Sequence, residues 1–470
     1  MATESASRVL PKLRRHSLNQ KLMLSNFKNK LYFPIAFYFR FFAGIRLKRW
    51  KPRIVVVTGS SGKTTLLHLL ESQLGKQAKY SHHANSSYGI PFDILDLHRK
   101  ELRTSEWFNF ILKAPLHAFK KPPKESLYIV EADTDRSGEG KFLAEFLKPE
   151  VVLWVSVGVT HAANFDQLAL PPRGSPSGHP RGVSSVEEAI AYDFGYFVEY
   201  CTKLAVVNGD LLLEMKEVER AKATVKIIKK SDALDDYKVE KTKTMFTING
   251  KKYAFEALLP EEVFYAIAMC REAVEYFDLP FDASFKNFVL PPGRGSMFAG
   301  IKNTTIIDSS YNANLSSVEA TLGMFEKFPA QKKWVVLGDM LELGEKEKEE
   351  HEKLGEILSG IDLERIILVG KRVSKYTYPS LRAKRGNPVI DEIASSFSTP
   401  RNDVVCFEKQ KDALEYLKEN VVGGEAILFK GSQSLFLEGI IEKLLDDKKD
   451  AAKLPRRGEF WEEKRERIYE

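Results

Sequence analysis

The sequence predicts an α/β fold built on parallel sheets, and three observations support this prediction. Strand-like runs such as 54–57 and 151–157 are almost continuously apolar, which is typical of strands covered on both faces. Helix-like runs, with apolar residues three to four positions apart, separate most of these strands. The 470 residues, 43% apolar and 29% charged, are enough for roughly two to four domains with their own cores.

The alternation of strands and helices divides the chain into four parts. Residues 1–50 form a basic, aromatic leader, and residues 51–290 form a first α/β domain with a parallel sheet. Residues 291–446 form a smaller, Rossmann-like α/β domain, and Pro291-Pro292-Gly293 makes a hinge in front of it. Residues 447–470 have many charges and few apolar side chains, which predicts a solvated helix or a disordered tail.

Other local patterns predict strands, a hairpin and a loop. Asn249-Gly250, inside the alternating residues 245–254, predicts a β-hairpin with a type I′ turn. Residues 170–185 are rich in Pro, Gly and Ser and predict a mobile surface loop. The remaining predicted strands are 127–131, 205–208, 304–308, 334–337, 366–369, 404–407 and 426–429.

The positive charge of the chain is concentrated at one end. The net charge is +7, but residues 1–53 contain thirteen Lys or Arg and one acidic residue, Glu4, and so carry +12. The remaining chain is therefore near −5 (7 − 12). A nucleic-acid-binding protein would need a basic face on a folded domain, so we expect no nucleic-acid partner.

The apolar part of the leader leaves two interpretations open. Residues 31–45 are aromatic and apolar, are interrupted by Pro34 and Arg40, and precede a basic cluster. These fifteen residues are fewer than the ~20 that a helix needs to cross a bilayer. Aromatic residues beside basic ones suit the surface of an anionic membrane, contacted through residues 1–53. Alternatively, this segment is an aromatic helix packed on the next domain, with a solvated basic flank.

The cysteines and the leader also indicate the compartment. Cys201, Cys270 and Cys406 lie far apart and share no metal-ligand spacing, which predicts buried thiols in a reducing environment. No small-residue cleavage site follows the leader, which argues against a signal peptide. We therefore expect a cytoplasmic protein, with possible peripheral contact at the inner face of the membrane.

The most specific motif is TGSSGKTT at residues 58–65, between a strand and a helix-like run. In such a loop the backbone N–H groups and the helix N-terminus cradle phosphate, and Lys63 adds a full positive charge. Thr64 is placed to offer its hydroxyl to a nucleotide-bound Mg²⁺. Gly59 and Gly62 are separated by two residues, where the usual P-loop has four between its glycines. The first domain is therefore predicted to be an ATPase domain whose P-loop is of a shorter kind.

Other polar residues follow predicted strands, where open α/β sheets bind ligands. Glu131 ends the strand 127–131, and His161 follows the strand 151–157, so both are expected at the edge that carries the P-loop. Together with that loop they predict a nucleotide–metal site. In the second domain the segments 308–314 and 338–344 also follow strands.

Taken in order, these segments resemble the Mur ligase family, and within it the dipeptide-adding branch. The resemblance covers about residues 51–446, and the segments YNAN and GDMLELG are the ones specific to that branch. The matching segments are TGSSGKTT at 58–65, NSSYGIP at 85–91, VEAD at 130–133, VGVTH at 157–161, NGD at 208–210, GR at 293–294, DSSYNAN at 308–314, LGDMLELGE at 337–345 and KGS at 430–432.

The resemblance implies a ligase that uses ATP and Mg²⁺ to join D-alanyl-D-alanine to a muramoyl-peptide carboxylate in peptidoglycan precursor synthesis. It implies Lys63, His161 and Arg294 as catalytic residues, and Thr64, Glu131 and His161 as metal ligands, direct or through water. It places Asn85, Asp339, Lys430 and Ser432 on the substrate side. The implied ATP-binding residues are Gly59, Ser60, Ser61, Gly62, Lys63, Thr64, Thr65, Arg294, Asp308, Tyr311 and Asn312.

The chain also departs from the family pattern. Family members carry a UDP-sugar-binding domain before the P-loop, whereas about fifty basic and aromatic residues precede it here. A lipid-linked or other acceptor is therefore an alternative to a soluble UDP-linked one. At the position of a carbamylated lysine that serves as metal ligand stands Phe194, with Asp193 beside it as a candidate substitute.

Three further positions differ near the expected nucleotide and substrate sites. Tyr265 stands in place of an asparagine, Gln433 in place of an arginine, and Ser309 in place of an aspartate. These changes leave open a further alternative, a catalytically weakened ATP-binding scaffold.

Overall fold

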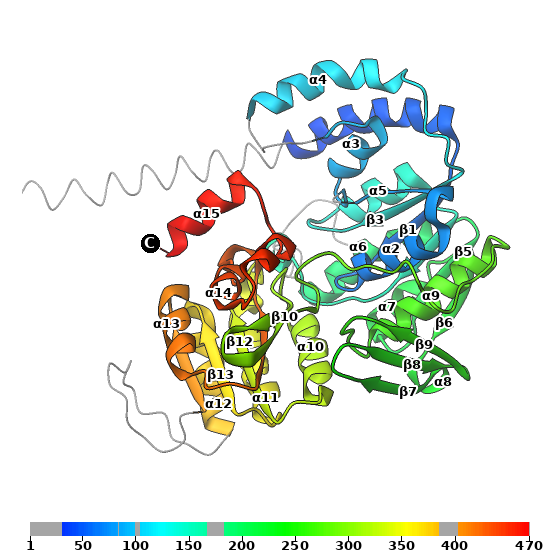
Figure 1. Cartoon of the computed structure of the whole chain (residues 1–470). Coiled ribbons are helices and arrows are strands. Elements are labelled where there is room, and N and C mark those ends of the chain that lie inside the picture. Colours follow the sequence, from blue (N-terminus) through cyan, green and yellow to red (C-terminus); the bar gives the residue numbers. More distant parts are fainter. Residues whose placement is uncertain (1–30, 83, 99–103, 167–182, 385–402, 470) are drawn as a thin grey trace, which may run out of the picture.

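A computed structural model describes residues 31–82, 84–98, 104–166, 183–384 and 403–469 (Figure 1). The first six-stranded sheet has the order β2-β3-β1-β4-β5-β6, and all of its neighbouring strands are parallel. Its strands are β1 (Arg53–Thr58), β2 (Ala78–Tyr80), β3 (Leu127–Ala132), β4 (Val151–Trp154), β5 (Leu204–Asn208) and β6 (Thr224–Ile228).

Helices cover both faces of this sheet, as the continuous apolar strands predict. Val55 and Val57 of β1 face one core, with α2 and α9, while Ile54 and Val56 face another. That second core includes α5, α6 and a helix over residues 31–50. The helices of this part are α2 (Lys63–Leu74), α3 (Gly89–Leu95), α4 (Thr104–Ala118), α5 (Glu139–Leu147), α6 (Val186–Glu199), α7 (Leu212–Val218), α8 (Lys230–Ala233) and α9 (Val263–Tyr276).

The predicted hairpin is confirmed within a small antiparallel sheet, β7 (Leu234–Val239), β8 (Thr244–Ile248) and β9 (Lys251–Phe255). Asn249 and Gly250 both have positive φ, 49° and 74°, which is the conformation that a type I′ turn requires. This sheet packs beside α9 and contributes to the same core as α2.

The second domain is built on a sheet of order β10-β11-β15-β12-β13-β14, in which β10 alone is antiparallel to its neighbour. Its strands are β10 (Ser296–Gly300), β11 (Thr304–Asp308), β12 (Lys332–Gly338), β13 (Arg365–Val369), β14 (Val404–Phe407) and β15 (Glu425–Lys430). Its helices are α10 (Leu315–Lys327), α11 (Glu347–Ser359), α12 (Tyr378–Lys384), α13 (Gln410–Asn420), α14 (Glu438–Leu444) and α15 (Glu459–Tyr469).

All nine predicted strands are present, with one shorter than expected. β4 ends at Trp154 because Ser156 turns toward the P-loop and bonds to it. The predicted loop 170–185 lies largely outside the described residues. In the tail, Arg456 forms a buried ion pair with Glu438 at 2.6 Å, and a helix, α15, follows it. Cys201 and Cys270 are buried as predicted, and Cys406 is half-buried.

The leader helix packs on the first domain. The ring of Phe39 lies 4.7 Å from that of Phe92, and Ala36, Phe39 and Ala43 are fully buried. Arg46 pairs with Asp96. One face of this helix therefore packs on the neighbouring domain, as the second of the two interpretations of the leader predicts. Among the described residues, none of the helices is long and apolar enough to cross a bilayer.

Candidate active site

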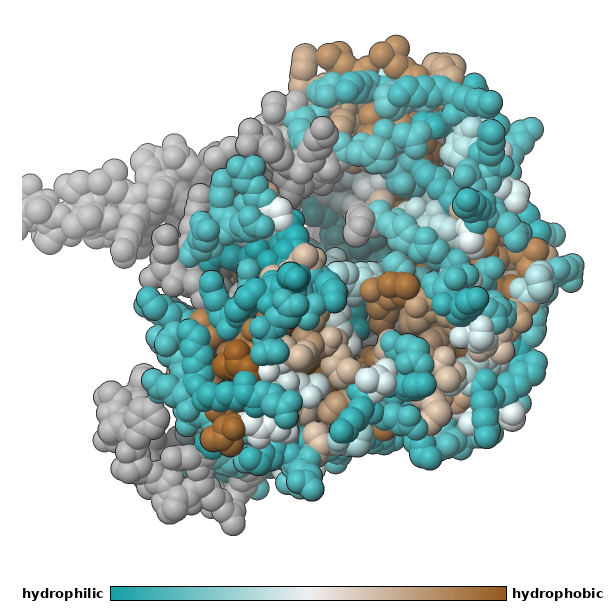
Figure 2. Space-filling model, in the orientation of Figure 1, coloured by the Kyte–Doolittle hydropathy of each residue, from teal (hydrophilic) through white to brown (hydrophobic). Residues whose placement is uncertain are grey.

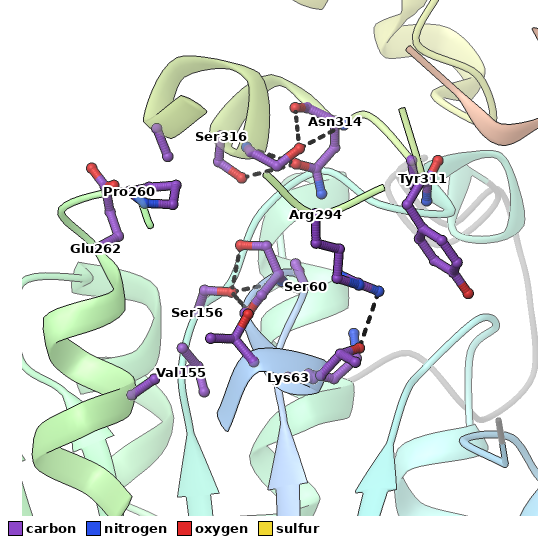
Figure 3. A pocket seen from close by; sticks show the side chains of 18 of the residues that line it. Ser60, Lys63, Val155, Ser156, Pro260, Glu262, Arg294, Tyr311, Asn314 and Ser316 are labelled. Carbon is purple, nitrogen blue, oxygen red and sulfur yellow. Dashed lines mark hydrogen bonds between the residues drawn. The ribbon is translucent and has the colours of Figure 1, made fainter. Parts of the chain in front are cut away.

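A cavity of about 730 Å³ lies between the two α/β domains, at the carboxyl ends of β1, β3, β4 and β11 (Figure 3). The P-loop forms one wall, and residues of the second domain form the opposite wall. The predicted site residues that line the cavity are Ser60, Ser61, Gly62, Lys63, Thr64, Thr65, Asn85, Glu131, His161, Arg294, Tyr311, Asn312 and Lys430.

Hydrogen bonds to the segment that follows β4 fix the conformation of the P-loop. Ser60 N–H donates to the Ser156 carbonyl at 3.0 Å, and Ser61 N–H donates to Ser156 Oγ at 2.8 Å. Gly59 and Gly62 have φ of 131° and 81°, and a Cβ at Gly59 would lie 2.6 Å from the Ser156 carbonyl oxygen. Only glycine fits at that position. These bonds couple the P-loop to the segment that follows the neighbouring strand β4.

Lys63 begins α2 and is almost fully buried. Its ammonium group donates to the Gly59 carbonyl and forms an ion pair with Asp133, with Nζ 2.7 Å from Oδ2. Asp133 belongs to the VEAD segment but was not singled out from the sequence. A buried lysine needs such a partner, because an unpaired charge is costly in a low-dielectric interior. The same ammonium group faces the cavity where phosphate would lie.

Thr64, Glu131 and Arg294 meet at the boundary of the two domains. Thr64 Oγ1 lies 3.1 Å from Glu131 Oε2, and Arg294 Nη2 donates to Thr64 Oγ1 at 3.1 Å. The parallel register of β1 and β3, which pairs Thr58 with Ala132, brings the ends of these strands together. Arg294 comes from the segment after the hinge, so it joins the second domain to the P-loop.

His161 is held between two carboxylates. Its Nε2 lies 3.2 Å from Asp135 Oδ1, and its Nδ1 lies 2.8 Å from Glu342 Oε2. Burial alone would lower the pKa of His161, but the hydrogen bond to Glu342 and the charges of Asp135 and Asp133 raise it to about 9. Burial and the charge of Asp133 raise the pKa of Asp135 to about 6. Sequence reasoning missed Asp135 and Glu342.

Two cations of the second domain also face the cavity. The Arg294 guanidinium lies 4.4 Å from the centre of the Tyr311 ring, and Lys430 Nζ donates to the Asn312 carbonyl at 3.0 Å. Burial lowers the pKa of Lys430 to about 7; the charge of Arg294 acts in the same direction, and that of Asp308 opposes it. An anion that entered the cavity would stabilise the charged form of Lys430.

Four predicted site residues lie outside the lining of the cavity: Gly59, Asp308, Asp339 and Ser432. Asp308 is fully buried at the end of β11, where Oδ1 accepts from Ser310 N–H at 2.9 Å. Asp339 Oδ1 accepts from the N–H groups of Arg372 and Val373, both at 2.9 Å. Ser432 N–H donates to the Asp339 carbonyl at 3.1 Å. In this structure these residues hold the loops behind the cavity wall.

The departures from the family pattern have distinct surroundings. Phe194 is fully buried, with its ring 6.1 Å from Trp154, so it belongs to the core. Asp193 accepts from Gly138 N–H and Gly140 N–H at the start of α5 and does not line the cavity. Tyr265 lines the cavity and donates its hydroxyl to Asp210. Ser309 and Gln433 line the cavity as well.

The donor set of the first-domain wall fits Mg²⁺. Thr64 and Glu131 supply a hydroxyl and a carboxylate, and Asp133, Asp135 and His161 have ligand atoms within 4.8 Å of one another. Hard oxygen ligands are those that Mg²⁺ prefers. Asp135 places a carboxylate beside His161, which neither Phe194 nor Asp193 does.

Comparison with known families identifies this arrangement. The Mur ligase middle domain matches residues 57–169, and the domain described as "Mur ligase, glutamate ligase domain" matches residues 293–433. These two matches cover more than half of the chain. The chain belongs to the Mur ligase family. Its members are ATP-dependent ligases, and this Mur ligase uses ATP with Mg²⁺.

Individual relatives narrow the comparison. A UDP-N-acetylmuramoyl-tripeptide–D-alanyl-D-alanine ligase of Bacillus subtilis is 24% identical over 84% of this chain and 76% of its own. The enzyme of that name from Escherichia coli is 23% identical over 68% of this chain and 65% of its own. Among solved structures, a Thermotoga maritima MurF ligase in complex with ADP shares 20% identity and superposes with a TM-score of 0.66. That superposition covers 92% of this chain and 84% of the other, which confirms the predicted α/β fold.

Proposed function

We propose that this Mur ligase joins D-alanyl-D-alanine to the carboxylate of a muramoyl peptide at the expense of ATP, in peptidoglycan precursor synthesis. The main observation behind this proposal is that residues of both domains line one cavity. Lys63 and Thr64 come from the P-loop, and Arg294 and Lys430 come from the second domain. The activity for which the Bacillus subtilis and Escherichia coli relatives are named supports the choice of amine and acceptor.

The reaction needs a carboxylate to become reactive toward an amine. A carboxylate oxygen of the acceptor attacks the γ-phosphorus of ATP, ADP leaves, and an acyl phosphate forms. The amine of D-alanyl-D-alanine then attacks the acyl carbon and loses a proton, and inorganic phosphate leaves. Phosphoryl transfer of this kind depends on positioning and on cations around the transferring group.

The residues of the cavity are suited to these tasks. Lys63 can exchange its bond to the Gly59 carbonyl for a phosphate oxygen while it keeps Asp133 as a partner. Arg294 reaches the P-loop from the opposite wall and can neutralise the same phosphate. Thr64 and Glu131 would hold Mg²⁺. Asp133, Asp135 and His161 form a separate group of ligand atoms that could hold a second ion. The ion supplies charge neutralisation to the bound nucleotide.

Substrate-dependent phosphate release tests this function. The purified protein is incubated with ATP, Mg²⁺ and a UDP-linked muramoyl tripeptide, with and without D-alanyl-D-alanine. We expect phosphate release that requires both the tripeptide and the dipeptide, and a product that carries the added dipeptide. ATP binding without turnover in any mixture would instead support the weakened scaffold and contradict the proposal.

We further propose that the acceptor is presented at the inner face of a membrane, which the protein contacts from the cytoplasm. The leader supports this: residues 31–53 contain six Lys or Arg and no Asp or Glu. A lipid-linked muramoyl peptide is then the second candidate acceptor. Replacing the UDP-linked acceptor by a lipid-linked one in the same assay decides between them, because only one should support full phosphate release.

A further inference from the structure

Two helices that lie side by side expose apolar residues along their outer surfaces. The leader helix, residues 31–50, and α4 run in the same direction: Tyr38 Oη donates to the Ile111 carbonyl at 2.7 Å, and Arg49 Nη1 donates to the Ala118 carbonyl at 2.9 Å. Figure 2 shows hydrophobic residues gathered along the upper edge of the molecule, where Figure 1 places α4.

The exposed apolar residues follow helical spacing. Large side chains on the outer surface of a folded domain are normally scattered, whereas these recur every three or four positions. Phe37, Phe41, Phe108, Leu112, Leu116 and Phe119 are between 54% and 70% exposed, and Ile111 is 38% exposed. We call these seven residues the two-helix face.

The inward sides of the same helices account for the fold. Ala36, Phe39 and Ala43 of the leader helix and Phe110, Ala114 and Ala118 of α4 are buried in one core. Both helices thus use one side to pack on the first domain and leave a second apolar side uncovered. Of the two-helix face, Phe37 also packs its ring edge-to-face on the core residue Phe142, at 4.9 Å. The other six residues are not needed for that core, so their exposure needs another explanation.

The charged residues that border the two-helix face are mostly positive. Exposed Lys48, Arg49, Lys120, Lys121 and Lys124 gather where the two helices end, as the Arg49 bonds to the Ala118 and Lys120 carbonyls show. Residues 31–53 contain no acidic residue, and Glu106 is the sole acidic residue of 104–124. Apolar side chains bordered by Lys and Arg are typical of helices that lie in the interface of an anionic bilayer.

We propose that the two-helix face docks flat on an anionic membrane, with its apolar side chains among the lipid tails and its lysines at the headgroups. A second copy of the chain would bring the same positive charge to the contact, which like-charge repulsion disfavours. The net charge of +6 on residues 31–53, from six Lys or Arg and no acidic residue, adds long-range attraction to the same membrane.

The leader helix also connects this face to the substrate side of the cavity. Tyr88 Oη donates to the Tyr32 carbonyl at 2.6 Å, and Tyr32 Oη donates to Glu139 Oε1 at 3.0 Å. The same Glu139 oxygen accepts from Ser87 N–H at 2.6 Å, in the loop that carries Asn85. Docking would therefore hold the acceptor-side loop near the bilayer. This last step rests on the function proposed above.

Vesicle co-sedimentation tests the docking without ligase chemistry. The full chain is mixed with phosphatidylcholine vesicles that contain about one third phosphatidylglycerol. The variant is Leu112→Gln with Leu116→Gln, which keeps charge and helix propensity. The matched control is Leu212→Gln with Val422→Gln, at two apolar positions that are 87% and 73% exposed elsewhere. Deleting residues 1–50 is unsuitable, because it would remove Phe39 from the core.

We expect the face variant to lose at least about tenfold in vesicle partition, and the control variant to bind like the wild type. Pure phosphatidylcholine vesicles, or Lys120→Gln with Lys121→Gln, should also weaken binding several-fold. Equal partition of the face variant and the wild type would overturn the proposal. So would a wild-type dimer that the face variant abolishes in sedimentation velocity, because a second copy would then cover the face.

Activity separates this inference from the proposed function. The face variant should keep wild-type phosphate release with a soluble muramoyl tripeptide and lose it with a vesicle-bound acceptor. Vesicle binding without dipeptide-dependent phosphate release would contradict the ligase function and leave the docking intact. The opposite result would contradict the docking alone.

Discussion

The two walls of the cavity are held in place by different kinds of contact. The first-domain wall is fixed by backbone hydrogen bonds, such as Ser60 N–H to the Ser156 carbonyl. The second-domain wall meets it mainly through side chains that cross the gap, Arg294 to Thr64 and Glu342 to His161. One long backbone bond, from Ala163 N–H to the Glu342 carbonyl at 3.4 Å, accompanies them. Backbone bonds within a sheet persist through domain motion, whereas single side-chain contacts can break and reform. The phosphate site is therefore preformed, and the catalytic arrangement depends on how the domains meet.

The largest effect should come from the preformed wall. Lys63→Ala removes the positive charge at the transferring phosphate, so we expect phosphate release to fall by at least about 10³-fold. The matched control is Lys79→Ala. Lys79 forms an ion pair with Asp93, with Nζ 3.0 Å from Oδ2, and it does not line the cavity. A near-normal rate for Lys63→Ala, with ATP still bound, would remove Lys63 from the mechanism.

The side-chain link across the gap should give the next largest effect. Arg294→Lys keeps the charge but loses the planar fork that reaches Thr64, so kcat should fall by about 10²-fold with a smaller change in KM for ATP. Arg271→Lys on α9, at an ion pair with Glu275, serves as the control. Steady-state kinetics measures both. If KM rises while kcat stays constant, Arg294 only binds nucleotide.

Nucleotide binding at the second-domain wall should be linked to proton uptake by Lys430. Its folded-state pKa of about 7 lies below the ordinary value of 10.5, so much of it is neutral at pH 8. An anion in the cavity raises that pKa, and binding of Mg²⁺-ADP between about pH 7 and pH 10 should take up about half to one proton. Calorimetry in buffers of different ionisation enthalpy measures this uptake. The same uptake by Lys430→Met would assign the proton to another group.

The smallest effect concerns the support of the first wall. Burial raises the pKa of Asp193 to about 7, above the ~4 expected for the unfolded chain. Its stabilising contribution is therefore complete below about pH 4 and is lost as the pH rises through 7. Asp193→Asn should flatten the pH dependence of the free energy of unfolding, measured by urea titration between pH 4.5 and 7.5. The change across this range should be smaller than in the wild type by on the order of 2 kcal/mol. The exposed control Asp236→Asn should keep the wild-type dependence.

The contrast between the walls also explains what the sequence could predict. The strands, the P-loop and the pairing of Thr64 with Glu131 follow from local apolar runs and from parallel neighbours meeting at one edge. Asp135 and Glu342 could not be foreseen. Glu342 reaches His161 from the other domain in a left-handed conformation, with φ of 65°, and no local pattern encodes how domains meet.

The leader shows the same limit in a different way. Its aromatic residues are compatible both with a helix that packs on the protein and with one that binds a membrane. A helix has more than one face, so both can hold for the same segment. The structure assigns Phe39 to the core and leaves Phe41 exposed, two positions apart in the sequence. The contribution of α4 was not predicted, since a fifteen-residue helix with apolar side chains on two sides resembles a buried one.

The charged segment 447–470 supports one wall of the cavity from behind. Arg456 pairs with Glu438 and donates to the carbonyls of Tyr311 and Ser310, the backbone behind one wall of the cavity. A nonsense mutation after codon 446 would leave Glu438 buried without its cation, at a cost of about 3–5 kcal/mol. Such an allele would resemble a lesion in the nucleotide site, although it alters neither the P-loop nor any residue that lines the cavity.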